Sequence, residues 1–504
     1  MDYANDMYGI TFDPAAKTSQ YRQLVNQLRD RIADGAIPGG TKLASSRELA
    51  DRLGIARGII LEAIEQLKLE GYLKTVRGSG TYVVGGLVWA RGKAEAGQHG
   101  SPRQGDSSRQ GSSPRQIGST RQIEAPRSPD PTAGAEEPGP DLSFAPGMPD
   151  LSLFPRRAWL SCYHDALEYA TDRELGYCPP VGSLRLREAI AAHVCEVKGI
   201  TADPEYIVIA AGASQCFSIL ASLFDPCKVI MEDPQAPFVR RVFTGLDARM
   251  TWVPVDEEGI IPEKIPGNGA HYLYVTPNHQ FPLGGTLSAA RRVQLLTKAR
   301  ETGSWIIEDD FDSEFRYGGK PVAPLQVMDP EQVIYVGTFS KILSPSLRLG
   351  FMIVPPGLRI RIKMAKLRWD FWNESLQQKA LALFIERGHL ARHLTRSHRA
   401  YRTKNIHLAS RLESSMPGIW QILGNATGMH LVIKPVNGSD VNTRMIAQEL
   451  RKNGIQVPTI GEYCRENRAF EDALILGYGN HTTGELDHFV DCLAALTQPE
   501  KLQR

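Results

Sequence analysis

A lysine with anion-binding neighbours follows an apolar stretch in the second half of the chain. Residues 333–336 are apolar and predict a buried strand, and the segment Gly-Thr-Phe-Ser-Lys341 comes directly after it. Arg348 stands seven residues beyond the lysine. A lysine amine can form an imine with an aldehyde, while the hydroxyls of Thr338 and Ser340 and the guanidinium of Arg348 can bind a phosphate. The segment therefore has the groups needed to hold a phosphorylated aldehyde.

Two more segments place complementary groups after predicted strands. Residues 305–308 predict a strand, and the carboxylate of Asp309, directly after it, can pair with the nitrogen of a pyridine ring. Residues 210–215 join a strand to a helix, so the backbone N–H groups of Gly212, Ala213 and Ser214 can bind a phosphate at a helix N-terminus. Each segment alone is a weak signal. Together with the lysine segment they predict a site for pyridoxal 5'-phosphate.

The elements that must position these groups alternate between strands and helices. This alternation predicts an α/β domain over residues 141–496, with a mainly parallel sheet covered by helices. Ligands of such sheets bind beyond the carboxyl ends of the strands, which is where Lys341 and Asp309 stand. We expect its strands at residues 206–210, 228–231, 271–275, 305–308 and 333–336.

Residues 14–84 predict a small domain of three helices followed by a hairpin. The first helix covers residues 21–32, the second begins at Ser45 or Ser46 and ends before Gly54, and the third covers about 56–70. The hairpin, residues 72–84, has a glycine-rich tip. This is the order of a winged helix-turn-helix, in which the third helix enters the major groove and the wing follows the DNA backbone.

Basic residues stand at the docking positions that this arrangement requires. Arg47 lies in the first turn of the second helix, Arg57 at the start of the third, and Arg77 at the tip of the wing. Gly78, beside Arg77, lets the wing backbone approach a phosphate closely. We therefore predict that these four residues contact double-stranded DNA.

Residues 85–140 predict a flexible basic linker, because the segment is rich in Gly, Ser, Pro, Gln and Arg and nearly free of large apolar residues. Arginines recur within it every six residues from 103 to 127, which leaves open a weak, salt-sensitive contact with DNA phosphates. The net charge of the whole chain is only +2, so an argument for DNA binding depends on where the basic residues stand.

The sequence also predicts the surroundings of the protein. Its seven cysteines have no C-x-x-C spacing and form no metal-ligand pattern with histidine, so we expect reduced thiols and no metal site. The N-terminus has no apolar core of signal-peptide length, and no run approaches the ~18 apolar residues of a membrane span. We expect a cytoplasmic protein without a membrane partner.

Both predicted domains resemble known families. From residue 21 the segments KLASSRELADRLG and LEGYLKTVRGSGTYV resemble the GntR-type winged helix over nearly its whole length. Residues 141–496 resemble a fold-type I, class I/II aminotransferase, with a large α/β domain and a smaller α+β subdomain. The segments that carry this resemblance are LSFAPGMPDLSLFP, GYCPPVGSLRLREAIAAHV, TPNHQFPLG, IIEDDFDSEFRY and GTFSKILSPSLRLG. The combination is similar to the MocR subfamily of GntR regulators.

The resemblance implies a role for each candidate residue. Lys341 would form the Schiff base with pyridoxal phosphate, and Asp309 would bind its ring nitrogen. Phosphate would be bound by Arg348, Thr338, Ala213 and Ser214, with Ser340 and Gly212 beside them. Tyr177 matches a phosphate-binding tyrosine that crosses between subunits, which implies a homodimer. His279 is either a cofactor contact or a hydrogen-bonded loop anchor.

Several positions depart from the family pattern. Phe311 replaces a tyrosine whose hydroxyl binds the phenolic oxygen of the cofactor in the family, although we expect Phe311 still to contact the cofactor. Ala236 replaces the aromatic residue expected near the cofactor ring. Phe238 is a candidate substitute for that ring contact. Phe238 and Gln456 stand where a GABA-responsive member has arginines for the carboxylate of its ligand, so GABA is a poor candidate effector.

The DNA-binding half departs from the pattern as well. Residues 56–59 read Ala-Arg-Gly-Ile where relatives commonly have Ser-Arg-Asn-Thr, so hydroxyl and amide donors to DNA are missing.

Three functions are compatible with these patterns. The first, which we favour, is a transcription regulator whose aminotransferase-like domain senses a small amine, an amino acid or pyridoxal phosphate and alters operator binding. The second is a working aminotransferase, with Lys341 also serving as general acid and base and the winged helix serving autoregulation. The third is a vestigial large domain that only dimerises. The sequence names neither the effector nor the operator.

Overall fold

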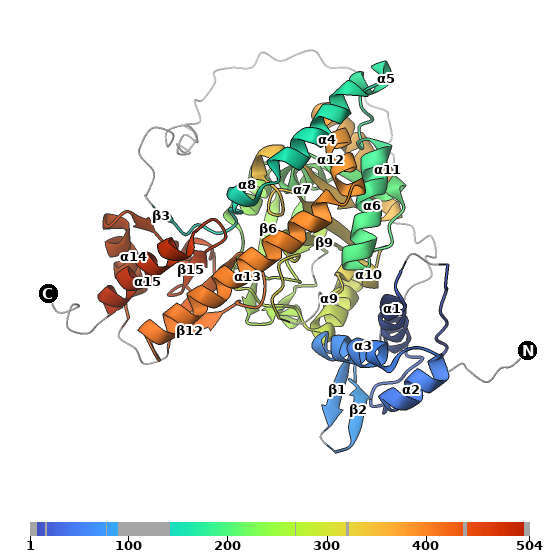
Figure 1. Ribbon diagram of the computed structural model, residues 1–504, viewed down its shortest axis with the longest axis horizontal. Helices are drawn as coiled ribbons and strands as arrows, with labels where there is room; N and C mark the ends of the chain where they lie inside the picture. Colours follow the sequence, from blue (N-terminus) through green and yellow to red (C-terminus); the bar gives the residue numbers. More distant parts are fainter. Residues whose placement is uncertain are drawn as a thin grey trace, which may run out of the picture.

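The computed structural model of the chain describes residues 8–15, 18–76, 78–88, 142–267, 269–318, 322–436 and 441–497. Figure 1 shows a small N-terminal body beside a much larger one. Of the predicted linker only residues 85–88 are described, so the linker and its arginines remain a prediction. None of the described helices is long and apolar enough to cross a membrane.

The small body has the predicted order of three helices and a hairpin. Ser45 caps the second helix by accepting a hydrogen bond from the backbone N–H of Glu48 (3.2 Å), and Gly54 ends it in the left-handed conformation. The third helix begins at Arg57, and the N-cap residue before it, Ala56, forms no side-chain cap. The predicted boundaries are confirmed within about two residues. The elements are α1 (Gln20–Ala33), α2 (Ser46–Leu53), α3 (Arg57–Leu69), β1 (Leu73–Val76) and β2 (Gly80–Val83).

The large body is built on a sheet in the order β4-β11-β10-β9-β8-β5-β6-β7. Neighbouring strands from β10 to β6 are parallel, so their carboxyl ends lie at one edge, whereas β11 and β7 run antiparallel to their neighbours. All five predicted strands are present, and the mainly parallel sheet is confirmed. The strands are β4 (Ile207–Ala210), β5 (Lys228–Asp233), β6 (Arg249–Asp256), β7 (Gly259–Ile260), β8 (Tyr272–Val275), β9 (Trp305–Asp310), β10 (Val333–Thr338) and β11 (Gly350–Ile353).

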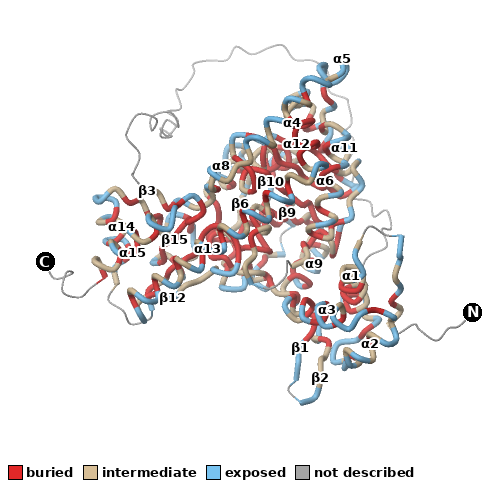
Figure 2. Tube along the Cα trace, in the orientation of Figure 1, coloured by how far each residue is buried: buried red, intermediate tan, exposed pale blue. Residues whose placement is uncertain are grey.

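Helices cover both faces of this sheet, because successive side chains of its strands point to opposite faces. Ile334 and Val336 of β10 pack in one apolar core with α7, α8 and α11, whereas Tyr335 packs in another with α6 and α12. Figure 2 shows the buried residues concentrated in the sheet and these helices, while the outer part of the β1–β2 hairpin is exposed. The helices are α4 (Arg156–Glu168), α5 (Asp172–Leu175), α6 (Leu184–Lys198), α7 (Ala213–Ala221), α8 (Pro237–Thr244), α9 (Ala289–Thr302), α10 (Leu325–Met328), α11 (Arg359–Asp370) and α12 (Leu376–Glu386).

A smaller subdomain follows the long helix α13 (His389–Ser415), which runs from the large sheet toward it (Figure 1). Its antiparallel sheet β12-β13-β15 packs with α14 and α15, and the short strand β3 pairs in parallel with β14. This is the predicted α+β subdomain. Its elements are β3 (Leu142–Ser143), β12 (Trp420–Leu423), β13 (His430–Pro435), α14 (Thr443–Lys452), β14 (Ile455–Gln456), β15 (Leu474–Gly477) and α15 (Thr483–Thr497).

The winged helix packs against the large domain. Arg22 of α1 donates a hydrogen bond to the backbone oxygen of Val197 at the end of α6 (3.2 Å), and the Tyr72 hydroxyl contacts the sulfur of Met328 in α10 (3.6 Å). The apolar core of the winged helix is continuous with residues of α9 and α10. In Figure 1 the small body accordingly lies next to these two helices.

Candidate functional site

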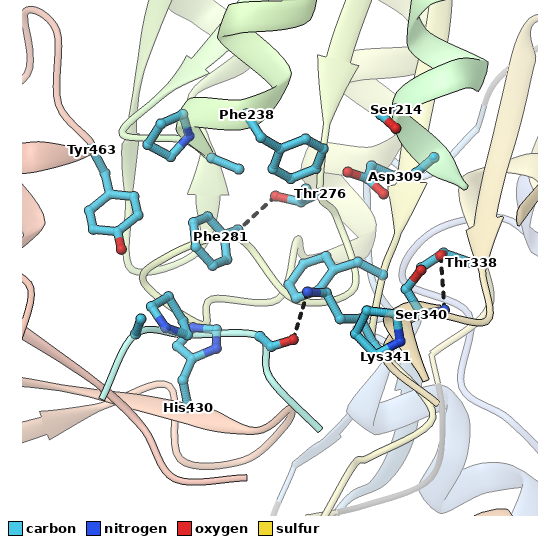
Figure 3. Close-up of a pocket in the computed structure, with 18 of the residues that line it drawn as sticks. Ser214, Phe238, Thr276, Phe281, Asp309, Thr338, Ser340, Lys341, His430 and Tyr463 are labelled. Carbon is cyan, nitrogen blue, oxygen red and sulfur yellow. Dashed lines mark hydrogen bonds between the residues drawn. The ribbon is translucent and has the colours of Figure 1, made fainter. Parts of the chain in front are cut away.

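A cavity of about 440 Å³ opens at the carboxyl edge of the sheet, where the parallel strands β8, β9 and β10 end. Lys341 and Asp309 both line it, and Figure 3 shows them together with Phe238, Phe281 and other lining residues. The volume is within the range typical of small-molecule sites. The lining residues are Ala145, Pro146, Gly147, Ala213, Ser214, Ala236, Pro237, Phe238, Arg241, Tyr274, Thr276, Phe281, Asp309, Phe311, Thr338, Ser340, Lys341, Pro345, Arg348, His430 and Tyr463.

Asp309 is a buried carboxylate at the end of β9. Its Oδ2 accepts a hydrogen bond from the hydroxyl of Tyr274 on the neighbouring strand β8 (2.7 Å). Burial raises the pKa of Asp309 to about 7, although the Tyr274 bond opposes this effect. A cationic ring N–H placed beside the carboxylate would stabilise its charged form.

Lys341 approaches the cavity just beyond the end of β10. Its Nζ donates a hydrogen bond to the backbone oxygen of Gly147 (2.6 Å), and burial lowers the pKa of the amine. A Cβ on Gly147, whose φ is +91°, would lie 2.7 Å from this Nζ, so only glycine lets the 145–147 loop come so close. The lowered pKa favours the neutral, nucleophilic amine.

A third group of side chains gathers where α7 begins. Arg348, held in the left-handed conformation at φ +47°, donates to the backbone oxygen of Ala211 (2.8 Å) and to the hydroxyl of Ser214 (3.1 Å). A Cβ on Gly212 would stand 2.9 Å from the same guanidinium. The backbone N–H of Ser340 bonds the Thr338 hydroxyl (3.1 Å). Cationic, hydroxyl and helix N-terminal donors thus converge at one end of the cavity.

Apolar rings line the opposite part of the cavity. Phe281 and Phe311 pack edge to face with ring centroids 5.7 Å apart. Phe238 lines the cavity from α8 and is 46% exposed, while Ala236 offers only a methyl group at the position where an aromatic ring was expected. The hydroxyl expected two residues after Asp309 is absent, because that residue is Phe311.

His279 lies behind this ring wall and does not line the cavity. Its Nδ1 is 2.6 Å from Oδ1 of Asp312, and its ring stacks on that of His430, with centroids 4.8 Å apart. His430 lines the cavity itself, and burial lowers its pKa to about 3. His279, Asp312 and His430 are close enough together to hold an ion, but the direct bond from His279 to Asp312 matches the loop-anchor interpretation equally well.

The winged helix presents an exposed face with three of the four predicted DNA contacts. Arg47 and Arg57 are exposed at the starts of α2 and α3, and Nε of Arg57 donates to the hydroxyl of Ser46 (3.1 Å). Gly78 is exposed in the wing with φ +76°, and no atom lies within 4 Å of where its Cβ would be. Arg77 lies outside the described residues.

Comparisons with known proteins agree with both halves of this architecture. The family "Bacterial regulatory proteins, gntR family" matches residues 20–83, and "Aminotransferase class I and II" matches residues 156–493. The chain is 32% identical to the HTH-type pyridoxine biosynthesis transcriptional regulator PdxR of Corynebacterium glutamicum, over 94% of each chain. It belongs to the MocR subfamily of GntR-type transcription regulators.

Two further likenesses support this assignment. The MocR-type chain is 31% identical to the probable rhizopine catabolism regulatory protein MocR of Rhizobium meliloti, covering 84% of this chain and 83% of that protein. Its fold matches the crystal structure of a multiple substrate aminotransferase from Thermococcus profundus with a TM-score of 0.65 at 24% identity, over 73% of this chain and 94% of the other. Fold-type I aminotransferase domains use pyridoxal 5'-phosphate, which is the predicted cofactor.

The cavity of this MocR-type regulator fits that cofactor. When bound, pyridoxal phosphate supplies an electrophilic aldehyde and an electron-withdrawing ring. Lys341 would hold the aldehyde carbon, and Asp309 would hold the ring nitrogen. Ser214, Thr338, Ser340 and Arg348 would hold the phosphate, in a cradle that a Cβ on Gly212 would fill. These roles are our proposals.

The structure does not bring every predicted residue to the cavity. Tyr177 is 80% exposed and stacks on Trp372, with ring centroids 5.2 Å apart, outside the cavity lining. Gln456 lies in the smaller subdomain, where the hydroxyl of Ser143 donates to its Oε1 (3.3 Å). Neither residue contributes to the cavity within the single chain.

Sequence reasoning also missed residues that line the cavity. Tyr274 is part of a predicted strand and carried no separate signal, while Arg241 lies one helical turn after Phe238 in α8. His430 and Tyr463 come from the smaller subdomain, far away in the sequence. The Phe281 segment was recognised only as a family landmark.

Proposed function

We propose that this MocR-type regulator binds an operator through its winged helix and that its aminotransferase-like domain, loaded with pyridoxal phosphate, senses a small amine, an amino acid or the cofactor itself. The proposal rests on one observation: Asp309 lines the same cavity as Lys341, and the residues on either side of it in β9 contact α10 and α6, the helices that the winged helix touches. We assign residues 14–84 to the DNA-binding domain, 85–140 to the linker and 141–496 to the sensing domain, acting in the cytoplasm.

The residue before Asp309 is tied to the winged helix through α10. Glu308, fully buried, accepts hydrogen bonds from the backbone N–H groups of Leu325 (2.9 Å) and Gln326 (3.0 Å), which begin α10. Met328 at the end of α10 is the residue that the Tyr72 hydroxyl contacts. A shift of β9 would therefore move a helix on which the winged helix rests.

The residue after Asp309 is tied to the winged helix through α6. Asp310 forms a buried ion pair with Lys198 (3.0 Å) and accepts a hydrogen bond from the Tyr335 hydroxyl (2.6 Å). Val197, next to Lys198, accepts the hydrogen bond from Arg22. Two buried carboxylates that flank the cofactor residue thus support the two contacts between the domains. Any effector must still bind the two arrangements with different free energies to shift DNA binding.

We also propose a homodimer. Tyr177 stacks on Trp372, and the chain just before Trp372 exposes further large apolar side chains: Ile360, Met364 and Phe371 are each at least half exposed. Monomeric proteins rarely leave contiguous apolar patches of this kind uncovered. A second copy placed there would cover the patch and would bring Tyr177 toward a neighbouring cavity, as the family resemblance implies.

The alternative function is a working aminotransferase. Lys341 and Asp309, the two groups that this chemistry requires, are both present in the cavity. Against efficient turnover, Phe311 lacks the expected hydroxyl and Ala236 lacks the expected ring. The same experiment can decide between the two functions.

The test is a titration of the purified protein on its own upstream DNA, with and without pyridoxal phosphate and candidate amines. We expect a visible absorbance band of bound cofactor and a ligand-dependent operator affinity in the wild type. Lys341→Ala should abolish the band and the ligand response but keep DNA binding. The control Lys452→Ala, at an exposed lysine of α14, should behave as the wild type. A full ligand response in Lys341→Ala would refute sensing through the Lys341 site, and many turnovers of an amino donor with a keto acid would favour the aminotransferase.

A further inference from the structure

Three arginines lie close together beside the cofactor cavity, and one of them, Arg241, lines it. Arg241 of α8 lines the cavity and is exposed, and among the described residues its guanidinium has no hydrogen bond or ion pair. Arg240 and Arg465 also have no side-chain partner in the described part of the chain. Burial lowers the pKa of Arg240, repulsion from Arg465 and Arg241 lowers it further, and attraction by Asp233 opposes the shift. The three guanidinium groups therefore lie near one another.

Asp233 explains why these arginines are held together. Its carboxylate, at the end of β5, accepts hydrogen bonds from the backbone N–H groups of Arg465 (2.8 Å), Glu466 (2.6 Å) and Asn467 (2.7 Å). These bonds fasten the 465–467 loop next to the start of α8. The carboxylate keeps its charge and attracts Arg240, so Asp233 offsets part of the positive charge. The guanidinium of Arg241, in contrast, has no hydrogen bond or ion pair with any described residue, and it is the arginine that lines the cavity.

Tyr463 offers a second polar group at the same cavity. Its side chain lines the same cavity and the residue is only 9% exposed, yet its hydroxyl forms no hydrogen bond with any other described residue. Figure 3 shows Tyr463 on the side of the cavity formed by the smaller subdomain. The ring is buried, but the hydroxyl oxygen remains accessible from the cavity, so a polar group bound there can form a hydrogen bond with it.

From this arrangement we propose that Arg241, supported by the charges of Arg240 and Arg465 and by the Tyr463 hydroxyl, binds an acid group of the effector. Within the proposed function, this makes the effector an amino compound that also carries a carboxylate or a phosphate, rather than a simple amine. A guanidinium matches the geometry of either anion. The amine end would face Lys341, and the acid end would face α8.

This inference revises an expectation from the sequence. By the family resemblance, Phe238 and Gln456 occupy the positions of carboxylate-binding arginines, which argued against GABA as the effector. Arg241 follows Phe238 by three residues in α8, and residues at this spacing lie on the same face of a helix. Arg241, on the next turn of the same helix, therefore supplies the cavity with the cation that Phe238 does not.

The test uses full-length protein loaded with pyridoxal phosphate and matched pairs of probes. The acidic amines are 3-aminopropanoate, 4-aminobutanoate and 5-aminopentanoate, and their neutral partners are propylamine, butylamine and pentylamine. O-phosphoethanolamine tests the phosphate form of the anion. Binding is followed by the change in the absorbance spectrum of the bound cofactor and by the thermal unfolding midpoint, and operator affinity is measured in parallel.

We expect at least one acidic amine to bind about tenfold more tightly than its neutral partner, or O-phosphoethanolamine to do so relative to ethylamine. Arg241→Gln should weaken that probe about ten- to a hundredfold, leave the neutral amines and cofactor binding unchanged, and be partly rescued by Arg241→Lys. Arg249→Gln, at an exposed arginine of β6 outside the cavity lining, is the matched control and should have no effect.

Four results would overturn the proposal: equal affinity within every pair, no effect of Arg241→Gln, no binding of any acidic probe up to ~10 mM, or loss of dimers in Arg241→Gln without a change in probe affinity. If neutral amines alter operator affinity and Arg241 has no role, the proposed function stands and this inference fails. If acidic probes bind through Arg241 but never alter operator affinity, the inference stands and sensing fails.

Discussion

At the scale of single residues, Asp309 should make the stability of the cofactor-free protein depend on pH. Burial raises its pKa from 3.8 to about 7, so the folded cofactor-free protein keeps a proton that the unfolded chain loses above about pH 4. Folded-state binding of this proton stabilises the protein at low pH, and the stabilisation is lost as pH rises through about 7. A bound cofactor would place a cation beside the carboxylate. The charged form of Asp309 would then be stabilised, and the loss of stability at higher pH would disappear.

Asp309→Asn should therefore flatten the pH profile of the cofactor-free protein. Between about pH 5 and pH 7 we expect the wild type to lose about 1 kcal/mol of stability per pH unit relative to the variant. The measurement is the thermal unfolding midpoint across this range. Asp472→Asn, at an exposed aspartate, is the control and should follow the wild type. Parallel profiles for the wild type and Asp309→Asn would contradict the assignment. Glu308, whose pKa burial also raises to about 7, contributes equally to both proteins. The pKa of Glu232 is raised to about 7 mainly by burial, and Asp309→Asn removes only the smallest of its causes, the charge of Asp309.

The residues that the sequence could locate are those that follow a strand within one short segment. Lys341, Asp309 and Ser214 were found in this way, because the carboxyl ends of parallel strands meet at one edge. Arg241, His430 and Tyr463 could not be found, because they reach the cavity from a helix face and from a subdomain far along the chain. Their arrangement depends on tertiary packing, which leaves no local pattern in the sequence.

At the scale of elements, the strand β9 both lines the cofactor cavity and holds α6 against the sheet. Asp309 points into the cavity, while Asp310, the next residue along the strand, points to the opposite face and meets Lys198 of α6. Lys198 also pairs with Glu314 (3.0 Å) and bonds the Ser313 hydroxyl, and its charge lowers the pKa of Asp310. The cluster fastens α6 to the edge of the sheet behind the cofactor site.

Replacement of Lys198 should loosen this junction. Lys198→Gln leaves Asp310 buried without its cation, and loss of one partner of a buried ion pair costs about 3 to 5 kcal/mol. The unfolding free energy in denaturant should fall accordingly. Lys298→Gln removes the same side chain from a partly exposed pair with Glu301 (3.8 Å) and should cost less than about 1 kcal/mol. Equal losses of unfolding free energy in the two variants would show that the buried Lys198 cluster stabilises the fold no more than a surface ion pair does.

Sequence patterns predicted which segments form strands, but they did not predict the order of those strands in the sheet. Apolar runs predicted β4, β5, β8, β9 and β10, because buried parallel strands are continuously hydrophobic. The strand β11 lies between β4 and β10 and runs antiparallel to both, although the sequence places it after β10. Periodicity within a segment reports burial and not the neighbour of a strand, so this crossover was not predictable from it.

At the scale of the whole molecule, the contact between the two domains lies next to the cofactor strand. Buried Arg29 and Glu70, paired at 2.8 Å, fix α1 against the end of α3, and this is the side of the winged helix that faces the large domain. Arg47 and Arg57 remain exposed. The DNA face and the docking face of the winged helix are therefore different surfaces, so docking can alter the placement of the DNA face without covering it.

Loss of a docking contact should uncouple sensing from DNA binding. Arg22→Ala removes the hydrogen bond to Val197 of the large domain, whereas Arg31→Ala removes an equivalent bond from α1 to Gly9 (2.9 Å) within the N-terminal segment. We expect Arg22→Ala to retain cofactor binding and basal operator affinity but to lose most of the ligand-dependent change, and Arg31→Ala to keep it. Operator titrations with and without ligand measure this difference. A ligand response of unchanged size in Arg22→Ala would show that the signal reaches DNA by another route, for which the linker and the proposed partner subunit are the remaining connections.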